Sequence, residues 1–60
     1  MILPNHEQCR AVMQEMDDFK ELNDFEREFV TSNLQREEFT LRQRESIAEF
    51  ADKYELESFP

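Results

Sequence analysis

Glycine and tryptophan are absent from this chain of 60 residues, cysteine occurs once, and proline occurs twice. Without glycine the chain has no Gly-rich loop of the kind that cradles phosphate groups, and we expect no helix to end in a left-handed residue. A single cysteine, Cys9, cannot form an internal disulfide. Both prolines, Pro4 and Pro60, lie near the ends and break no internal element.

Positive charge and long apolar runs are also scarce. Seven basic residues face 15 acidic ones, which gives a formal net charge of -8. Phosphate backbones and anionic membranes repel such a surface, so we expect neither general nucleic-acid binding nor membrane association. The opening "MILPNHEQCR" has no basic segment before its apolar residues, so we expect no signal peptide and a cytoplasmic protein.

The small size of the chain limits its core. A chain of this length buries only about 60% of its unfolded surface, so a monomer would have a thin core. The composition is nevertheless too apolar for a disordered chain, because 38% of the residues are hydrophobic and six are phenylalanine. With no disulfide and no evident metal set, we expect oligomerisation, most simply a symmetric dimer, to complete the fold.

Three helix starts are marked in the sequence by capping boxes. In each, an Asn or Thr precedes a Glu or Gln by three residues, so that each side chain can bond the other's backbone amide. The pairs are Asn5 with Gln8, Asn23 with Glu26, and Thr40 with Gln43. They predict one all-α domain, residues 1–60, with helices near 6–21, 24–36 and 41–56, arranged as a helical hairpin or small bundle.

Apolar spacing supports these helices and suggests how they pack. The middle helix carries apolar residues on two separated arcs, so it needs two neighbours, either both from its own chain or one from a partner protein. We predict that a hairpin of the second and third helices has a core made of Leu22, Phe25, Phe29, Ile47, Phe50 and Tyr54. We predict an interaction surface that is closed either within the chain or across a twofold axis and consists of Met13, Met16, Val30 and Leu34.

Candidate chemistry in the sequence is sparse. Arg42, Gln43 and Arg44 stand where a helix-turn-helix protein presents base-reading side chains, but the neighbouring glutamates favour an exposed first turn with Gln43 in a cap. His6 and Cys9 share the spacing of a metal pair, yet no second pair follows, and zinc requires more ligands. No residues are candidates for catalysis, so we expect a protein that is not an enzyme and binds no cofactor or metal.

The stretch "LNDFEREFVTSNLQREEFTLRQRESIAEFADKY" resembles a helical-hairpin segment of small bacteriophage proteins. The family is that of the accessory proteins encoded in the early region of lambdoid temperate phages, between the exonuclease and excisionase genes. Two features depart from the family pattern: Phe25 is more often tryptophan, and "QREEFT" replaces a glycine-containing connection. The matching residues are Leu22, Phe25, Glu26, Phe29, Arg36, Leu41, Gln43, Ile47, Lys53 and Tyr54.

This resemblance implies a protein of the host bacterial cytoplasm that contacts a host or phage protein and influences the choice between lytic and lysogenic development. Two other functions remain open. An acidic DNA mimic would occupy the basic cleft of a nucleic-acid-binding protein, although basic residues are interleaved along every predicted helix. A helix-turn-helix DNA binder is disfavoured by the net charge of -8.

Overall fold

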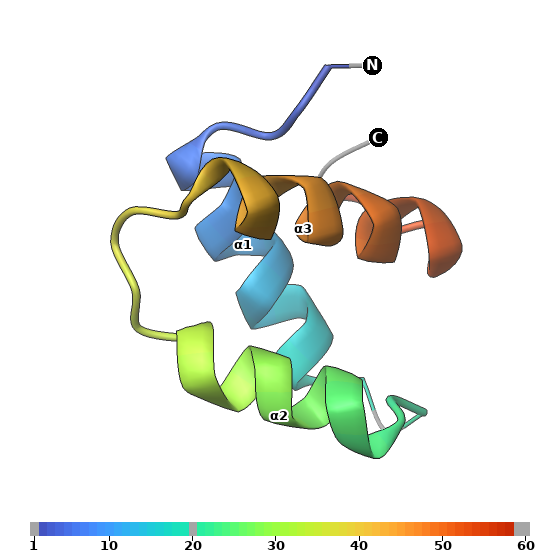
Figure 1. Cartoon of the computed structure of the whole chain (residues 1–60). Helices are drawn as coiled ribbons and strands as arrows, with labels where there is room; N and C mark the ends of the chain where they lie inside the picture. Colours follow the sequence, from blue (N-terminus) through green and yellow to red (C-terminus); the bar gives the residue numbers. More distant parts are fainter. Residues whose placement is uncertain (1, 20, 59–60) are drawn as a thin grey trace.

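The computed structural model describes residues 2–19 and 21–58, which form three α-helices and contain no strand. The helices are α1 (His6–Asp17), α2 (Asp24–Asn33) and α3 (Leu41–Lys53). Figure 1 shows α1 running between the other two, and α1 packs closely against both. The predicted all-α class is therefore confirmed, in its small-bundle form.

All three helices begin at the capping boxes that the sequence indicates. Asn5, Asn23 and Thr40 accept the amide three residues further on, at 2.8, 2.8 and 3.1 Å respectively. In return the Gln or Glu at that third position accepts the cap residue's own amide. Two otherwise unpaired amides are thus satisfied at each helix start, which fixes where the helix begins.

The helices end earlier than predicted, and α1 ends because Phe19 leaves the helix. The Phe19 amide donates to the Met16 carbonyl at 2.9 Å, and the Phe19 ring packs edge-on against Tyr54, with centroids 5.4 Å apart. Arg27 of α2 donates to the backbone carbonyls of Asp17 and Phe19, which α1 leaves unpaired at its end. Residue 20, within the predicted range 6–21, lies outside the described residues.

Helix α2 ends at Asn33, which is 6% exposed. Both polar atoms of its side chain form hydrogen bonds. Its Nδ2 donates to the Phe29 carbonyl at 2.8 Å. Its Oδ1 accepts from Arg36 Nε at 3.0 Å and from Gln43 Nε2 at 3.2 Å. The end of α2 is thereby tied to the start of α3, and the predicted continuation to residue 36 does not form.

Helix α3 ends in a left-handed residue although the chain has no glycine. Glu55 has φ 51°, its amide donates to the Asp52 carbonyl at 3.3 Å, and the Leu56 amide donates to the Ala51 carbonyl at 2.9 Å. These two bonds form a Schellman motif. The expectation of no left-handed helix end was therefore wrong, because the motif turns Leu56 into the core, where it is 3% exposed.

The core is built on one face of α1. Residues from all three helices, the α2–α3 connection and the C-terminal segment contribute, and the buried members are Cys9, Val12, Met13, Met16, Val30, Phe39, Ile47, Ala51 and Leu56. Of the predicted interaction surface, Met13, Met16 and Val30 are each 0% exposed, so these residues pack within the chain, which is one of the two predicted alternatives. Leu34 is half-buried against the same core.

The residues predicted for the hairpin core lie in or against the core except Phe25, but α2 and α3 each pack on α1 and do not form the predicted hairpin with one another. Ile47 is fully buried, and the half-buried residues packed against the core include Leu22, Phe29, Phe50 and Tyr54. Phe25 is 70% exposed, so its predicted place in the core was wrong. The reason is that α1 covers α2 along a face centred on Val30, and Phe25 lies outside that face. Of the two neighbours that α2 needs, both come from its own chain.

Candidate functional site

The Arg42–Gln43–Arg44 cluster is largely used for internal contacts. Gln43 serves in the α3 capping box and also bonds Asn33. Arg44 Nε donates to the Pro4 carbonyl at 2.8 Å and anchors the N-terminal segment to α3. Arg42 is exposed, so one side chain of the three faces solvent without a hydrogen bond among the described residues. The arrangement leaves little for base reading.

His6 and Cys9 also have internal partners. The Phe39 amide donates to His6 Nδ1 at 3.0 Å, and the two rings stack with centroids 6.5 Å apart. Cys9 is 0% exposed, and burial raises the pKa of its thiol, which makes it a poor nucleophile or ligand. Within residues 2–19 and 21–58, no group of three or more His, Cys, Asp or Glu side chains is placed to hold a metal ion.

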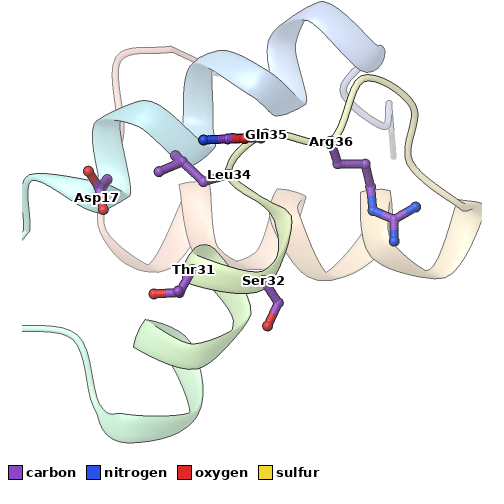
Figure 2. Close-up of a pocket in the computed structure, with 6 residues that line it drawn as sticks. All are labelled: Asp17, Thr31, Ser32, Leu34, Gln35 and Arg36. Carbon is purple, nitrogen blue, oxygen red and sulfur yellow. The ribbon is translucent and has the colours of Figure 1, made fainter.

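A depression lies where the end of α1 faces the end of α2. It is open to solvent, and its lining is Asp17, Thr31, Ser32, Leu34, Gln35 and Arg36. Figure 2 shows the hydroxyl groups of Thr31 and Ser32 and the guanidinium of Arg36 pointing in different directions. Because these groups do not converge on one point, the depression lacks the arrangement that would orient a small substrate.

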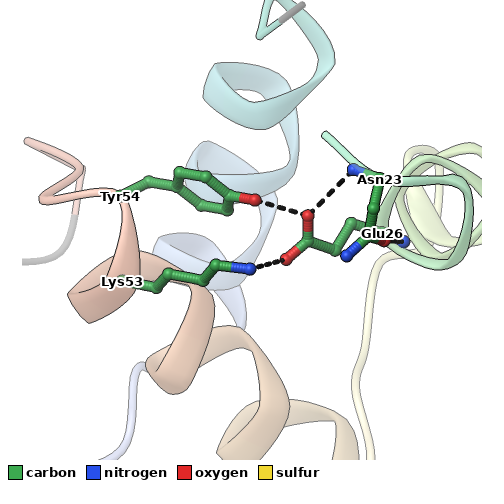
Figure 3. A network of polar contacts seen from close by, with 4 residues as sticks. All are labelled: Asn23, Glu26, Lys53 and Tyr54. Atoms are coloured by element: carbon green, nitrogen blue, oxygen red, sulfur yellow. Dashed lines mark hydrogen bonds and ion pairs between the residues drawn. The ribbon is translucent and has the colours of Figure 1, made fainter. Parts of the chain in front are cut away.

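A buried carboxylate joins the start of α2 to the end of α3 (Figure 3). Glu26 is 2% exposed. Its Oε1 accepts the Asn23 amide at 3.1 Å and the Tyr54 hydroxyl, and its Oε2 accepts Lys53 Nζ at 2.8 Å. All of its partners are donors, so the carboxylate is satisfied in its ionised form.

These donors shift the pKa values of the network. Hydrogen bonds from Lys53 and then from Tyr54 lower the pKa of the Glu26 carboxyl to about 2. The same contacts with Glu26 raise the pKa of the Lys53 ammonium and of the Tyr54 hydroxyl. In all three groups the pKa moves away from neutral pH. The network therefore lacks a group suited to general acid or base catalysis and acts as a structural clamp.

Most carboxylates are exposed, while most basic side chains of the described residues already have hydrogen-bond partners. Every Asp and Glu other than Glu15 and Glu26 is exposed. Arg10 donates to the Glu37 carbonyl at 2.7 Å, and Arg27 and Arg44 also bond backbone carbonyls. The ion pairs found among the described residues are Arg27 with Asp17 and Lys53 with Glu26. Most exposed carboxylates are therefore left without a paired cation in this part of the chain.

Among residues 2–19 and 21–58, the exposed large apolar side chains are Ile2 at 84%, Phe25 at 70% and Leu41 at 60%. Phe25 is the aromatic one and lies in the first turn of α2, beside the exposed Asp24 and Glu28. Helical spacing alone does not separate Phe25 from Phe29, since both lie on similar sides of the helix. The burial of Glu26 was also not predicted. The features of the sequence that could have indicated it are the capping position of Glu26 and the presence of a Lys and a Tyr near the end of α3.

Comparison with protein-family models, curated proteins and solved structures finds no match to this chain. Across the described ranges 2–19 and 21–58, no helix is long and apolar enough to cross a membrane.

Proposed function

We propose that the protein is a non-enzymatic accessory protein that acts by binding another protein. The observation that carries this proposal is the exposure of Phe25. The three helices enclose a core without it, yet its ring stands 70% exposed on α2. An aromatic ring held on a rigid helix loses little conformational freedom on binding, and such rings are frequent anchors of protein interfaces.

The resemblance to phage early proteins supplies the biological setting of the proposal. In that setting the partner is a host or phage factor in the bacterial cytoplasm, and binding modulates lytic or lysogenic development. The polar groups described above support contact over catalysis, because the buried Glu26 is committed to Lys53 and Tyr54.

Affinity capture from a bacterial lysate tests the proposal. The bait is the whole chain, compared with Phe25→Ser, which removes the exposed ring and leaves the core intact. The matched control is Leu41→Ser, because Leu41 is also an exposed apolar side chain in the first turn of a helix. We expect one protein to be retained by the wild type and by Leu41→Ser and lost from Phe25→Ser. Capture that is unaffected by Phe25→Ser, or no specific capture at all, contradicts the proposal.

An acidic mimic of DNA is the second candidate, and the exposure of the carboxylates favours it. Every Asp and Glu other than Glu15 and Glu26 is exposed. The interleaved cations argue against a continuous acidic face, because Arg10, Arg27 and Arg44 keep their charge while they donate to backbone carbonyls. A mimic would bind with a steep salt dependence and would be displaced by duplex DNA, whereas contact through Phe25 would respond less to salt.

Self-association is the remaining possibility for the same surface. The expected dimer contact consisted of Met13, Met16, Val30 and Leu34, of which the first three are buried within one chain and Leu34 is half-buried. A dimer would therefore need another contact, and Phe25 is the exposed aromatic candidate. Sedimentation equilibrium of the wild type and Phe25→Ser at low and moderate salt distinguishes a second copy from a different partner.

A further inference from the structure

Three phenylalanines lie next to one another across α2 and α3, and we call them the aromatic strip: Phe25, Phe29 and Phe50. Phe25 and Phe29 are four residues apart on α2, so they lie one turn apart on the same side of the helix. The rings of Phe29 and Phe50 meet edge to face, with centroids 5.3 Å apart. Phe29 and Phe50 are half-buried, so the strip extends from the core to the exposed Phe25 ring.

The residues beside the strip carry negative charge. Asp24 precedes Phe25 and Glu28 follows it by three residues, while Glu49 precedes Phe50 on α3. All three carboxylates are exposed, and none belongs to an ion pair among the described residues. The strip is therefore apolar in its centre and acidic at its rim.

The cations nearest to the strip in sequence do not reverse this charge. Lys53 follows Phe50 by three residues, but its Nζ lies 2.8 Å from Glu26 Oε2, so the buried carboxylate offsets its charge. Arg27 reaches back to the end of α1, where it donates to the carbonyls of Asp17 and Phe19. The net charge around the aromatic strip thus remains negative.

We propose that the aromatic strip is the docking surface for a cationic amphipathic helix of a partner protein. Its apolar side chains pack on the rings, and its Lys or Arg side chains face Asp24, Glu28 and Glu49. This inference rests on the proposed function and specifies the chemistry of the partner. A helix presents apolar groups at three- and four-residue spacing, which suits a strip that spans two helices, and the described residues offer no strand edge for an extended peptide.

The charge of the chain favours a different protein, and not a second copy of this chain, as the partner on the aromatic strip. Each chain carries a net charge of -8, so two copies repel one another, whereas a cationic helix is attracted to the same rim. Apolar contact supplies affinity in the centre, and the rim favours basic partners over acidic ones.

A titration followed by NMR tests the proposal with a defined probe. The isotope-labelled full chain is titrated with a synthetic peptide of lysine and leucine whose leucines form one helical face. A scrambled peptide of the same composition has the same charge without that face. We expect the helical peptide to shift amide signals in residues 24–32 and 46–53. We expect scrambling, or Phe25→Ser in the protein, to weaken binding by about tenfold or more, and Leu41→Ser to leave it unchanged.

Four results would overturn the inference. Equal binding of the scrambled peptide would mean that charge alone attracts the probe. Amide shifts centred away from the aromatic strip would place the docking surface elsewhere. Shifts of the strip amides on dilution of the protein without peptide would identify a second copy as the occupant. Capture of a cellular protein through Phe25 together with failure of the helical peptide would leave the proposed function standing and exclude the cationic helix.

Discussion

The ammonium group of Lys53 lies 2.8 Å from the carboxylate of Glu26, and the Glu26 side chain is only 3% exposed. The contact joins residues 27 positions apart in the chain. It links the first turn of α2 to the last turn of α3, on the side where Phe29 meets Phe50. The two helices that carry the aromatic strip are therefore held together by a clamp of opposite charges.

Removal of the Glu26 charge should destabilise the fold. Glu26→Gln keeps a side chain suited to the capping box but loses the charge-assisted bonds from Lys53 and Tyr54. We expect the free energy of unfolding to fall by about 1–3 kcal/mol, measured by urea denaturation. Glu28→Gln, an exposed acid on the same helix, should change it by no more than about 0.5 kcal/mol. Equal effects of the two substitutions would mean that the clamp contributes no stability.

The same clamp should give a defined dependence of stability on pH. The pKa of the Glu26 carboxyl is about 2 in the folded chain against an ordinary value of 4.5, so the unfolded chain takes up the proton first as pH falls. Its contribution is fully present above pH 4.5 and is lost as pH falls toward about 2. Glu15 also has a lowered pKa, chiefly through a hydrogen bond from Ser58, and contributes in the same direction.

Comparison with Glu26→Gln isolates the Glu26 part of this pH dependence, because both proteins retain Glu15. The difference in unfolding free energy between wild type and Glu26→Gln should shrink as pH is lowered through this window. A difference that stays constant down to about pH 2 would show that the Glu26 pKa is not lowered by folding.

Glycine at position 55 should stabilise the protein. Glu55 adopts φ 51° to complete the Schellman motif, a conformation that costs a residue with a Cβ about 1 kcal/mol and glycine much less. We expect Glu55→Gly to raise the free energy of unfolding by about 1 kcal/mol. Glu49→Gly, at an exposed position inside α3, should lower it by about 0.5–1 kcal/mol. Thermal denaturation of both variants checks the prediction, and a loss of stability in Glu55→Gly would refute the left-handed cap.

The His6 ring should act as a hydrogen-bond acceptor that fixes the connection between α2 and α3. His6→Phe preserves an aromatic ring against Phe39 but leaves the Phe39 amide without its partner, and we expect a loss of about 1 kcal/mol. His6→Asn places an amide oxygen near the position of Nδ1 and should retain more of the stability. Faster hydrogen exchange of the Phe39 amide in His6→Phe than in His6→Asn would confirm that His6 acts as the acceptor. Equal exchange rates in the two variants would contradict this role.

The helix starts were predictable from the sequence because a capping box involves residues only three positions apart. The helix ends were not, because each depends on contacts made after the chain folds. Asn33 ends α2 while bonding Gln43, and Glu55 takes a left-handed conformation so that Leu56 reaches the core. Apolar spacing also located part of the core, since it identified Ile47 and the half-buried Phe29 and Phe50 that pack in or against it.

The sequence did not predict which of the two apolar arcs of α2 is buried. The sequence placed Val30 outside the core and Phe25 within it, whereas Val30 is 0% and Phe25 70% exposed. The choice depends on where α1 crosses α2, which the spacing within α2 does not contain. The burial of Glu26 was not predicted either. Its carboxylate is buried because Lys53 and Tyr54, near the end of α3, supply hydrogen-bond donors to it.

The affinity of the captured partner for the Phe25→Ser variant tests the central claim most directly. Because the ring is 70% exposed, its removal should leave the melting temperature nearly unchanged while removing an anchor of the interface. Isothermal titration of the partner into wild type and Phe25→Ser, with Leu41→Ser as control, should give binding weaker by about tenfold or more for Phe25→Ser alone. Equal affinity of all three proteins, each folded, would contradict a contact function centred on the aromatic strip.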